Sequence, residues 1–324
     1  MNRITIPDTE LSLCPIGMGA IGAGLKWDGK EADTMFATYL ELGGNLVDTA
    51  RIYQDWVPGE IGRSERAVGD WIKRSGKRNE IILMTKGGHP KFTGPQDDLH
   101  LSRMSDADMR YDLELSLRAL QTDVIDIYFY HRDNERQSIE EEIETMENFV
   151  REGKIRYYAC SNWSADRMRQ ADAYCREKGY RGFVADQTLL NVGMVHMKPM
   201  SDDTLTSLKD DILAYHKEQS HNLAMAYSST AGGFFQRLIE KGEVPESNYA
   251  TPGNLAVAEK IKALAAQYET GVTQIVLAYV LNREFPCVAL IGPGKPERIT
   301  ESMKTLEIAW KREDFQNLTT IEDA

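Results

Sequence analysis

The sequence predicts an α/β protein, a (β/α)8 TIM barrel built as a single domain from residues 1–324. Apolar, β-branched runs alternate with segments of helical periodicity along the whole chain, and there are eight such runs. No shift in composition and no Pro/Ser-rich linker divides the chain. A doubly wound open sheet is the alternative fold. It would need a GxGxxG motif after its first strand to bind a dinucleotide, and the sequence has none there.

The predicted elements follow this alternation in order. We expect strands at about residues 10–17, 45–50, 80–86, 124–131, 155–161, 182–188, 222–228 and 286–291. We expect helices at about residues 31–42, 62–75, 105–120, 138–152, 164–178, 203–218, 254–283 and 296–304. The third helix illustrates the pattern, because Ser105 precedes it, Asp108 follows three residues later, and Leu113 and Leu117 then share one face.

The opening residues RITIPDTELSLCPIG predict a short hairpin that turns at Pro7 and Asp8, and we expect it to cover the bottom of the barrel. Three connections, 87–104, 189–202 and 229–253, are too long for tight turns. Long loops on the catalytic face of such a barrel usually shape the substrate pocket. We expect these loops to form a lid or wall from His89, Phe92, Met194, Met197, Phe234, Phe235 and Tyr249.

Composition excludes several classes of function. The net charge of −12 argues against sequence-independent binding to nucleic acid or to an anionic membrane surface. The first residues lack the apolar core of a signal peptide, and no apolar run approaches 18 residues, so we expect a cytoplasmic protein. The four cysteines are widely separated, and neither they nor the histidines show metal-ligand spacing. We therefore expect buried thiols and no metal.

Four polar residues stand where strand-like runs end: Asp48, Tyr53, Lys86 and His131. Loops after the strands of a β/α barrel gather on one face, so these side chains can meet in one pocket. A phenol has an unperturbed pKa near 10, and a nearby ammonium group lowers it. We therefore expect Lys86, held by Asp48, to activate Tyr53 as a proton donor to a carbonyl oxygen, with His131 orienting the carbonyl.

Each of the four residues alone has a simpler interpretation. Asp48 could cap a loop, Tyr53 could pack in the core, and Lys86 and His131 could be solvated. Their matching positions at the ends of successive strands favour the site. Proteins carry no hydride donor of their own, so carbonyl reduction implies a nicotinamide cofactor.

The chain resembles the aldo-keto reductases over essentially its whole length. The resemblance rests on the segments GMGAIG, GGNLVDTARIY, GRSERAVGDWI, ILMTKGG, SLRALQTDVIDIYFYHR, VREGKIRYYACSNW, FVADQTLLN, MAYSSTAGGFF and GPGKPERITES. It implies the barrel fold, NAD(P)H-dependent reduction of an aldehyde or ketone, and a catalytic tetrad at Asp48, Tyr53, Lys86 and His131.

The resemblance also implies a set of cofactor-binding residues. Ser161, Asn162 and Gln187 match the ligands of the nicotinamide carboxamide, and Tyr227 matches the aromatic residue that stacks on the nicotinamide ring. The residues matching the pyrophosphate-binding stretch are Ser228, Ser229, Ala231 and Gly232. The residues matching the stretch around the adenosine half are Gly292, Gly294, Lys295, Arg298, Glu301 and Ser302.

Lys295 and Arg298 favour NADPH over NADH, because the additional phosphate of NADPH is anionic. The chain departs from the commonest pattern of the family at Ser302, where many relatives have asparagine. It also lacks the Lys-Ser pair that many relatives place before that arginine.

The expected partner is a small carbonyl substrate, and nothing in the sequence predicts an oligomeric state. Candidate pocket residues are Trp56, His89, Arg132, Asp133 and Trp163, and tryptophans beside Arg and Asp suit a sugar-derived aldehyde or ketone. The alternative is that Trp56 and Trp163 pack against the barrel rim and that the charged pairs are solvated. Two other functions fit the fold, namely an NADP(H)-binding regulatory subunit and a barrel isomerase or lyase that uses no redox cofactor. The intact tetrad favours the reductase.

Overall fold

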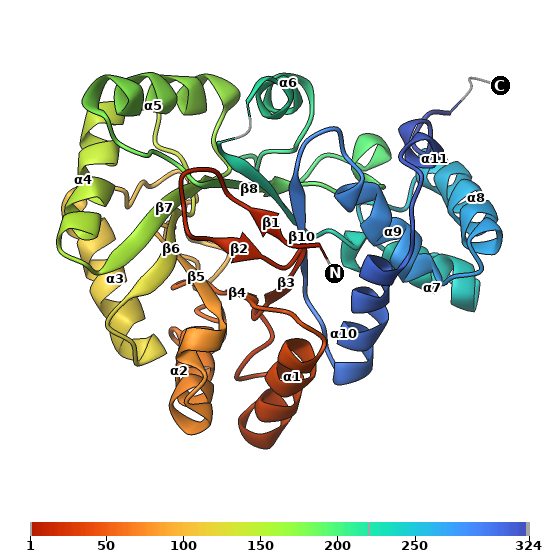
Figure 1. Cartoon of the computed structure of the whole chain (residues 1–324), viewed down its shortest axis with the longest axis horizontal. Coiled ribbons are helices and arrows are strands. Elements are labelled where there is room, and N and C mark those ends of the chain that lie inside the picture. The colour runs from red at the N-terminus through yellow and green to blue at the C-terminus, as the bar shows by residue number, and fades with distance from the viewer. Residues whose placement is uncertain (1, 220, 322–324) are drawn as a thin grey trace.

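The computed structural model describes residues 2–219 and 221–321. Eight parallel strands close into a barrel in the order β10-β3-β4-β5-β6-β7-β8-β9, so the predicted (β/α)8 fold is confirmed (Figure 1). The barrel strands are β3 (Ile16–Gly19), β4 (Leu46–Asp48), β5 (Ile82–Gly87), β6 (Ile125–Tyr130), β7 (Ile155–Ser161), β8 (Ala185–Leu189), β9 (Leu223–Tyr227) and β10 (Cys287–Ile291).

The helices surround the strands, as Figure 1 shows. They are α1 (Gly29–Glu41), α2 (Arg63–Ser75), α3 (Asp106–Leu120), α4 (Ile139–Arg151), α5 (Ala165–Lys178), α6 (Asp210–Glu218), α7 (Phe234–Lys241), α8 (Pro252–Gln267), α9 (Val272–Leu281), α10 (Pro296–Met303) and α11 (Glu313–Gln316). Short 3-10 turns lie at Arg78–Glu80, Met194–His196, Ala231–Gly233 and Lys304–Glu307.

Serine caps begin three of these helices. The side chains of Ser105, Ser138 and Ser164 each accept a hydrogen bond from the backbone N–H three residues later. Each bond satisfies one of the donors that a helix leaves free in its first turn, which stabilises the helix by about 1 kcal/mol. The N-cap predicted at Ser105 is therefore present.

A separate two-stranded antiparallel sheet, β1 (Ile4–Thr5) and β2 (Ser12–Leu13), forms the predicted N-terminal hairpin. Its apolar residues Ile6, Leu11 and Leu13 are buried with the side chains that fill the barrel interior. The hairpin also contacts the starts of the barrel strands, because Glu10 N–H donates to the Tyr157 hydroxyl at 3.2 Å. It therefore closes the amino-terminal end of the barrel.

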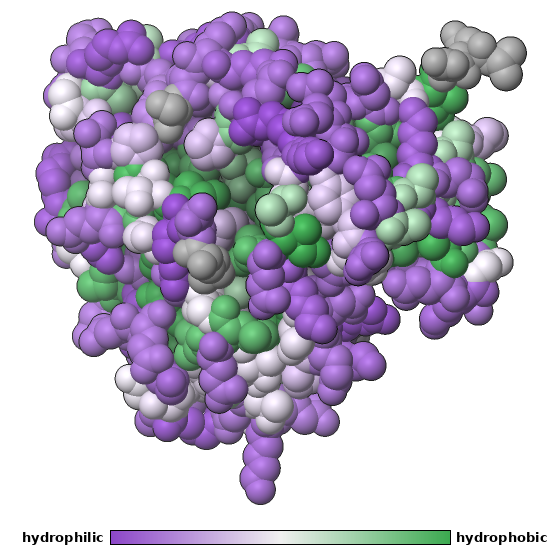
Figure 2. All heavy atoms as spheres, turned by 45° about the vertical axis from the view of Figure 1, so that its right-hand side comes forward, coloured by the Kyte–Doolittle hydropathy of each residue, from purple (hydrophilic) through white to green (hydrophobic). Residues whose placement is uncertain are grey.

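The alternation of side chains along each strand divides the core into two layers. Met84 and Phe129 face the barrel interior, whereas Leu83 and Tyr128 pack outward against the helices. Hydrophilic side chains cover most of the face shown in Figure 2, with smaller hydrophobic areas between them. Within the described ranges, no helix is both long and apolar enough to cross a membrane.

Three predicted elements were wrong in detail. The run at 10–17 is divided between β2 and β3, because Pro15 lies between them and has no N–H to donate to a continuous ladder. The helix expected at 203–218 begins only at Asp210, since Thr206 N–H and C=O bond to Asn162 and Leu189 and so hold the preceding segment extended. The helix expected at 254–283 is two helices, and Glu269 between them has a φ of 50°.

The predicted loops also differ from expectation. Residues 229–253 include α7, and Phe234 and Phe235 are fully buried, so they belong to the core rather than to a lid. The stretch 87–104 is mostly irregular, and Phe92 remains exposed on it.

Candidate active site

The four polar residues at the strand ends meet at the carboxyl end of the barrel. Asp48 is two residues from Leu46, Lys86 is two from Met84 and His131 is two from Phe129, and these three apolar residues all face the interior. Strand alternation therefore directs Asp48, Lys86 and His131 inward as well. Tyr53 reaches them from the loop that follows β4.

Lys86 is the centre of this cluster and is fully buried. Its Nζ lies 2.7 and 2.9 Å from the two carboxylate oxygens of Asp48, 2.8 Å from the Thr49 carbonyl oxygen and 3.3 Å from the Tyr53 hydroxyl. The ammonium group is thus held by oxygen atoms of three residues, Asp48, Thr49 and Tyr53. A buried charge needs such compensation, because transfer out of water without a partner is costly.

Burial and charge act in opposite directions on the pair Lys86 and Tyr53. Burial lowers the pKa of Lys86, but Asp48 and Tyr53 together raise it above its ordinary value. Burial raises the pKa of Tyr53, and Lys86 only partly offsets this effect. The phenol is therefore protonated at neutral pH, which suits a proton donor. The sequence had led us to expect that Lys86 lowers the pKa of Tyr53 below its ordinary value. This prediction was wrong, because the effect of burial is larger.

His131 is buried beside two other rings. Its ring centroid lies 5.9 Å from that of Tyr53 and 4.7 Å from that of His89. Burial, followed by His89 and Arg132, holds the pKa of His131 well below its usual range, and burial lowers the pKa of His89 to about 4. Both imidazoles are neutral at pH 7, so His131 can donate or accept one hydrogen bond without carrying charge.

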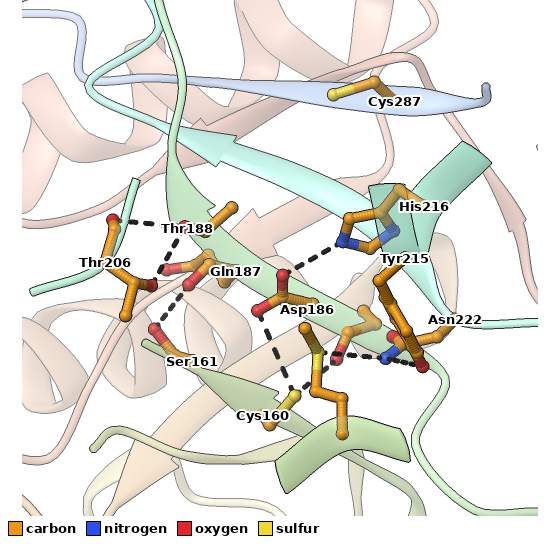
Figure 3. Close-up of polar contacts among 12 residues, drawn as sticks. Cys160, Ser161, Asp186, Gln187, Thr188, Thr206, Tyr215, His216, Asn222 and Cys287 are labelled. Carbon is orange, nitrogen blue, oxygen red and sulfur yellow. Dashed lines mark hydrogen bonds and ion pairs between the residues drawn. The ribbon is translucent and has the colours of Figure 1, made fainter. Parts of the chain in front are cut away.

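Ser161 at the end of β7, Asn162 directly after it and Gln187 on β8 form one hydrogen-bonded chain with the cluster, in which Asn162 Nδ2 donates to Ser161 Oγ at 3.1 Å. Ser161 Oγ donates to the Gln187 carbonyl oxygen at 2.8 Å, a contact drawn in Figure 3, and Gln187 Nε2 donates to Asp48 Oδ1 at 3.1 Å. Asn162 Oδ1 accepts from the Tyr227 hydroxyl at 3.0 Å. In Figure 3, Asp186 next to Gln187 reaches instead to His216 of α6, at 3.0 Å, which fastens β8 to the helix outside it.

A cavity of about 700 Å³ opens over this cluster. Its lining runs from Asp48, Tyr53 and His131 to α10 at the far end. The predicted cofactor residues in the lining are Ser161, Asn162, Gln187, Tyr227, Ser228, Ser229, Gly232, Gly292, Gly294, Arg298 and Ser302. Three other predicted residues, Ala231, Lys295 and Glu301, do not belong to the lining formed by the described part of the chain.

The far end of the cavity is built from glycine-rich turns that begin two helices. Gly232 has a φ of 61°, and a Cβ atom there would meet no other atom within 4 Å. It lies just before α7, and Gly292 and Gly294 lie just before α10. Free backbone N–H groups and the dipole of each helix favour an anion at such positions.

Charged groups at this end are partly paired with one another. Arg298 Nη1 lies 2.6 Å from Glu301 Oε2, and Glu301 Oε1 accepts from Thr273 at 2.6 Å. Glu301, which was expected to face an adenine, is thus engaged with two residues of the protein. Lys295 has a side chain that is 61% exposed and lies 3.9 Å from Glu297.

Sequence reasoning missed several residues of the lining. They are Ile21, Lys26, Leu205, Gln236, Arg237, Lys241 and Thr273, among others. Arg237 and Lys241 could have been found, because they are four residues apart on a helix that directly follows the glycine-rich turn. Leu205 could not have been found from the sequence, because its segment was predicted to be part of a helix.

The candidate substrate residues divide into two groups. Arg132 lines the cavity, His89 packs on His131, and Trp56 is partly exposed beside Phe92. Trp163 is fully buried and donates to the Arg132 carbonyl oxygen at 3.0 Å, while Asp133 pairs with Arg167 at 3.2 Å. Trp163 and Asp133 therefore hold the loop after β6 and offer no face to a substrate.

Comparison with known proteins agrees with this architecture. The model of the aldo/keto reductase family matches residues 15–323, so the chain belongs to the aldo/keto reductase family. Among its relatives are norsolorinic acid reductase A of Aspergillus parasiticus, 27% identical over 99% of this chain and 81% of that protein, and aryl-alcohol dehydrogenase [NADP(+)] of Phanerodontia chrysosporium, 25% identical over 98% and 84%. These names support an oxidoreductase enzyme of carbonyl and alcohol chemistry.

Proposed function

We propose that the protein is an NAD(P)H-dependent reductase that converts an aldehyde or ketone to an alcohol, with Tyr53 as the proton donor. One observation carries the proposal. Tyr53 and His131 line a cavity, and directly beneath the phenol the buried Lys86 joins it to Asp48. This is the arrangement that protonation of a carbonyl oxygen requires, since a neutral phenol faces the reacting group and a fixed positive charge stabilises the phenolate left behind.

The residues around the cavity fit a nicotinamide dinucleotide. Ser161, Asn162 and Gln187 offer the hydroxyl and amide groups that can pair with a carboxamide, and the hydroxyl of Tyr227 is tied to Asn162. At the other end, the turns before α7 and α10 suit phosphates. When bound, the dinucleotide supplies the hydride that the protein itself lacks.

The chain's own groups then have separate tasks. The Tyr53 hydroxyl gives its proton to the carbonyl oxygen, and Lys86 stabilises the resulting phenolate. Asp48 holds the ammonium group in place at 2.7 Å. Neutral His131 is suited to orient the same oxygen through a hydrogen bond.

NADPH is the preferred cofactor in this proposal. Arg298, Arg237 and Lys241 all line the cavity, and such cations favour a dinucleotide with an additional phosphate. The name of one relative, aryl-alcohol dehydrogenase [NADP(+)], points the same way.

The replacement Tyr53→Phe tests the proposal. It removes the proton donor and keeps the ring, so NADPH-dependent reduction of a simple aldehyde should fall by about 10²–10⁴-fold. NADPH binding, followed by the quenching of tryptophan fluorescence, should stay largely unchanged. Tyr111→Phe on the exposed face of α3 is the matched control. Near-normal turnover by Tyr53→Phe, or no binding of either dinucleotide by the unaltered protein, would refute the proposal.

A further inference from the structure

Arg132 is a charged residue of the cavity to which the proposed chemistry assigns no role. It follows His131 directly, lines the same cavity as Tyr53, and is only 8% exposed. A guanidinium so deeply placed beside a reaction centre has lost most of its hydration. It therefore needs partners, and its remaining donors attract an acceptor strongly.

Three hydrogen bonds fix the guanidinium in place. Nε donates to Thr204 Oγ1 at 2.8 Å, Nη1 to the His131 carbonyl oxygen at 2.9 Å, and Nη2 to Asp202 Oδ2 at 3.1 Å. The group has five N–H donors. No other acceptor in the described part of the chain takes them, so two N–H groups, one on each terminal nitrogen, are left for a ligand.

The segment that supplies these partners is itself tied to the active site. Thr206 N–H donates to Asn162 Oδ1 at 3.1 Å, and the Thr206 carbonyl oxygen accepts from the Tyr227 hydroxyl at 3.3 Å. Between the two threonines, Leu205 lines the cavity. Arg132 is therefore preorganised, and binding a ligand would not require it to be ordered first.

The surroundings of Arg132 favour an anion over a neutral polar group. Burial and, after it, the positive charge of Arg132 lower the pKa of both His131 and His89. The two neighbouring rings are therefore neutral, and Arg132 is a cation beside them that can attract an anionic ligand. Asp202 is the one carboxylate bonded to Arg132 among the described residues, and it takes a single N–H at 3.1 Å. A bidentate contact to a carboxylate or phosphate would use the donors that remain.

A sugar with a stacking face fits this end of the cavity less well. The predicted stacking residue Trp163 is fully buried against Phe183, with ring centroids 4.9 Å apart. Trp56 lies beside Phe92 and is not among the described residues that line the cavity.

We propose that Arg132 binds an oxyanion of the substrate, so that the preferred substrate is a short aldehyde or ketone with a carboxylate or phosphate a few bonds from the carbonyl carbon. The inference rests on the proposed function, because it takes Tyr53 and His131 as the groups that meet the carbonyl. Arg132, next to His131, then selects substrates that carry an anionic group near the carbonyl.

Two matched pairs of substrates test the proposal with the intact chain and NADPH. One pair is succinic semialdehyde and its methyl ester, and the other is glyceraldehyde 3-phosphate and glyceraldehyde. The unaltered protein should have a kcat/KM at least about tenfold higher for the anionic member of one pair, as expected for a charge-assisted contact. The pair that shows the preference identifies the anion as carboxylate or phosphate.

Two variants should change this preference in opposite directions. Arg132→Met should reduce the ratio of anionic to neutral kcat/KM to about one, mainly through KM for the anion. Asp202→Asn removes the competing carboxylate and should raise the ratio, whereas damage to the fold alone would lower both rates together. Equal rates for both members of each pair in the unaltered protein would overturn the proposal, and so would a ratio that neither variant moves. Failure to reduce even the neutral aldehydes would instead refute the proposed function.

Discussion

The two ends of the cavity are built on different principles. At one end lie Asp48, Tyr53, Lys86 and His131, here called the catalytic cluster. Asp48, Lys86 and His131 are buried and Tyr53 is half-buried; Lys86 contacts both Asp48 and Tyr53, and the His131 ring packs beside Tyr53. At the other, the turns around Gly232 and Gly292–Gly294, together with Arg298, form a glycine-rich end with open space where side chains would be. At the first end, the charged groups Asp48 and Lys86 are paired within the protein. At the second end, backbone N–H groups and cations are open to a ligand. In the proposed function, this difference means that the fold itself positions the proton-donating groups, whereas the affinity for a dinucleotide depends on the open space and donors at the glycine-rich end.

The largest expected effect comes from removing the centre of the catalytic cluster. Lys86→Met leaves Asp48 buried without its ammonium partner, which should destabilise the protein by about 3–5 kcal/mol. It also removes the charge that stabilises the phenolate, so reduction should fall by about 10²–10⁴-fold. Urea unfolding and steady-state kinetics measure the two effects.

Lys295→Met is the control for that change, because the Lys295 side chain is 61% exposed. Surface substitutions of this kind usually alter stability by less than about 0.5 kcal/mol. If Lys86→Met were as stable as the control, the buried pair would not support the cluster as described.

Gly232→Val should separate the two ends. Gly232 has a φ of 61°, where a β-branched residue is strained by about 1–2 kcal/mol, and the new side chain would enter the cavity. We expect NADPH binding, followed by fluorescence titration, to weaken by about 10–100-fold, or roughly 1.4–2.8 kcal/mol. The catalytic cluster should be unaffected in structure.

Gly242→Val is the matched control, since Gly242 ends α7 with a φ of 69° and a Cβ there also meets nothing within 4 Å. Both variants should lose similar stability, but only Gly232→Val should lose affinity. Equal losses of affinity would show that the effect comes from strain in α7 and that the turn does not face the ligand.

The two ends also differ in how well the sequence predicted them. The residues Asp48, Lys86 and His131 stand at strand ends, where period-two alternation and barrel topology fix their direction, so their meeting could be expected. The long-range hydrogen bonds of Thr206 to Asn162 and Leu189 leave no pattern in the local sequence. The helical periodicity of residues 203–218 therefore led to the wrong prediction of a helix for the segment around Thr204, which holds Arg132. Trp163 was misplaced for a related reason, because composition alone does not tell a buried tryptophan from one that faces a pocket.

Burial of His89, which packs beside His131 of the catalytic cluster, should also be visible as a pH dependence of stability. The pKa of His89 is lowered to about 4 by burial, against an ordinary value near 6.5. The unfolded chain therefore binds more protons between these values, and stability is lost as the pH falls below 6.5. From pH 7 to pH 5, His89 should account for a loss of about 2 kcal/mol in the free energy of unfolding.

His89→Gln removes that contribution, so urea unfolding at pH 7 and pH 5 should show a smaller difference than in the unaltered protein. His100→Gln is the control, because the His100 side chain is 66% exposed and lies in the same long loop. An unchanged difference in His89→Gln would mean that His89 is protonated readily and that this end of the cavity is wetter than its burial indicates.

The smallest expected effect concerns the choice between dinucleotides at the glycine-rich end. Arg298 lines the cavity, although its Nη1 lies 2.6 Å from Glu301, whereas Lys295 points its mostly exposed amine toward Glu297. Arg298→Ala should therefore weaken NADPH about tenfold more than NADH, or about 1.4 kcal/mol, and Lys295→Ala should change that ratio less. The sequence alone gave both residues the same role, so unequal effects would make Arg298 the main phosphate ligand of the two. Titrations with both dinucleotides measure the ratio, and equal losses of NADPH and NADH in Arg298→Ala would remove the argument for phosphate recognition at α10.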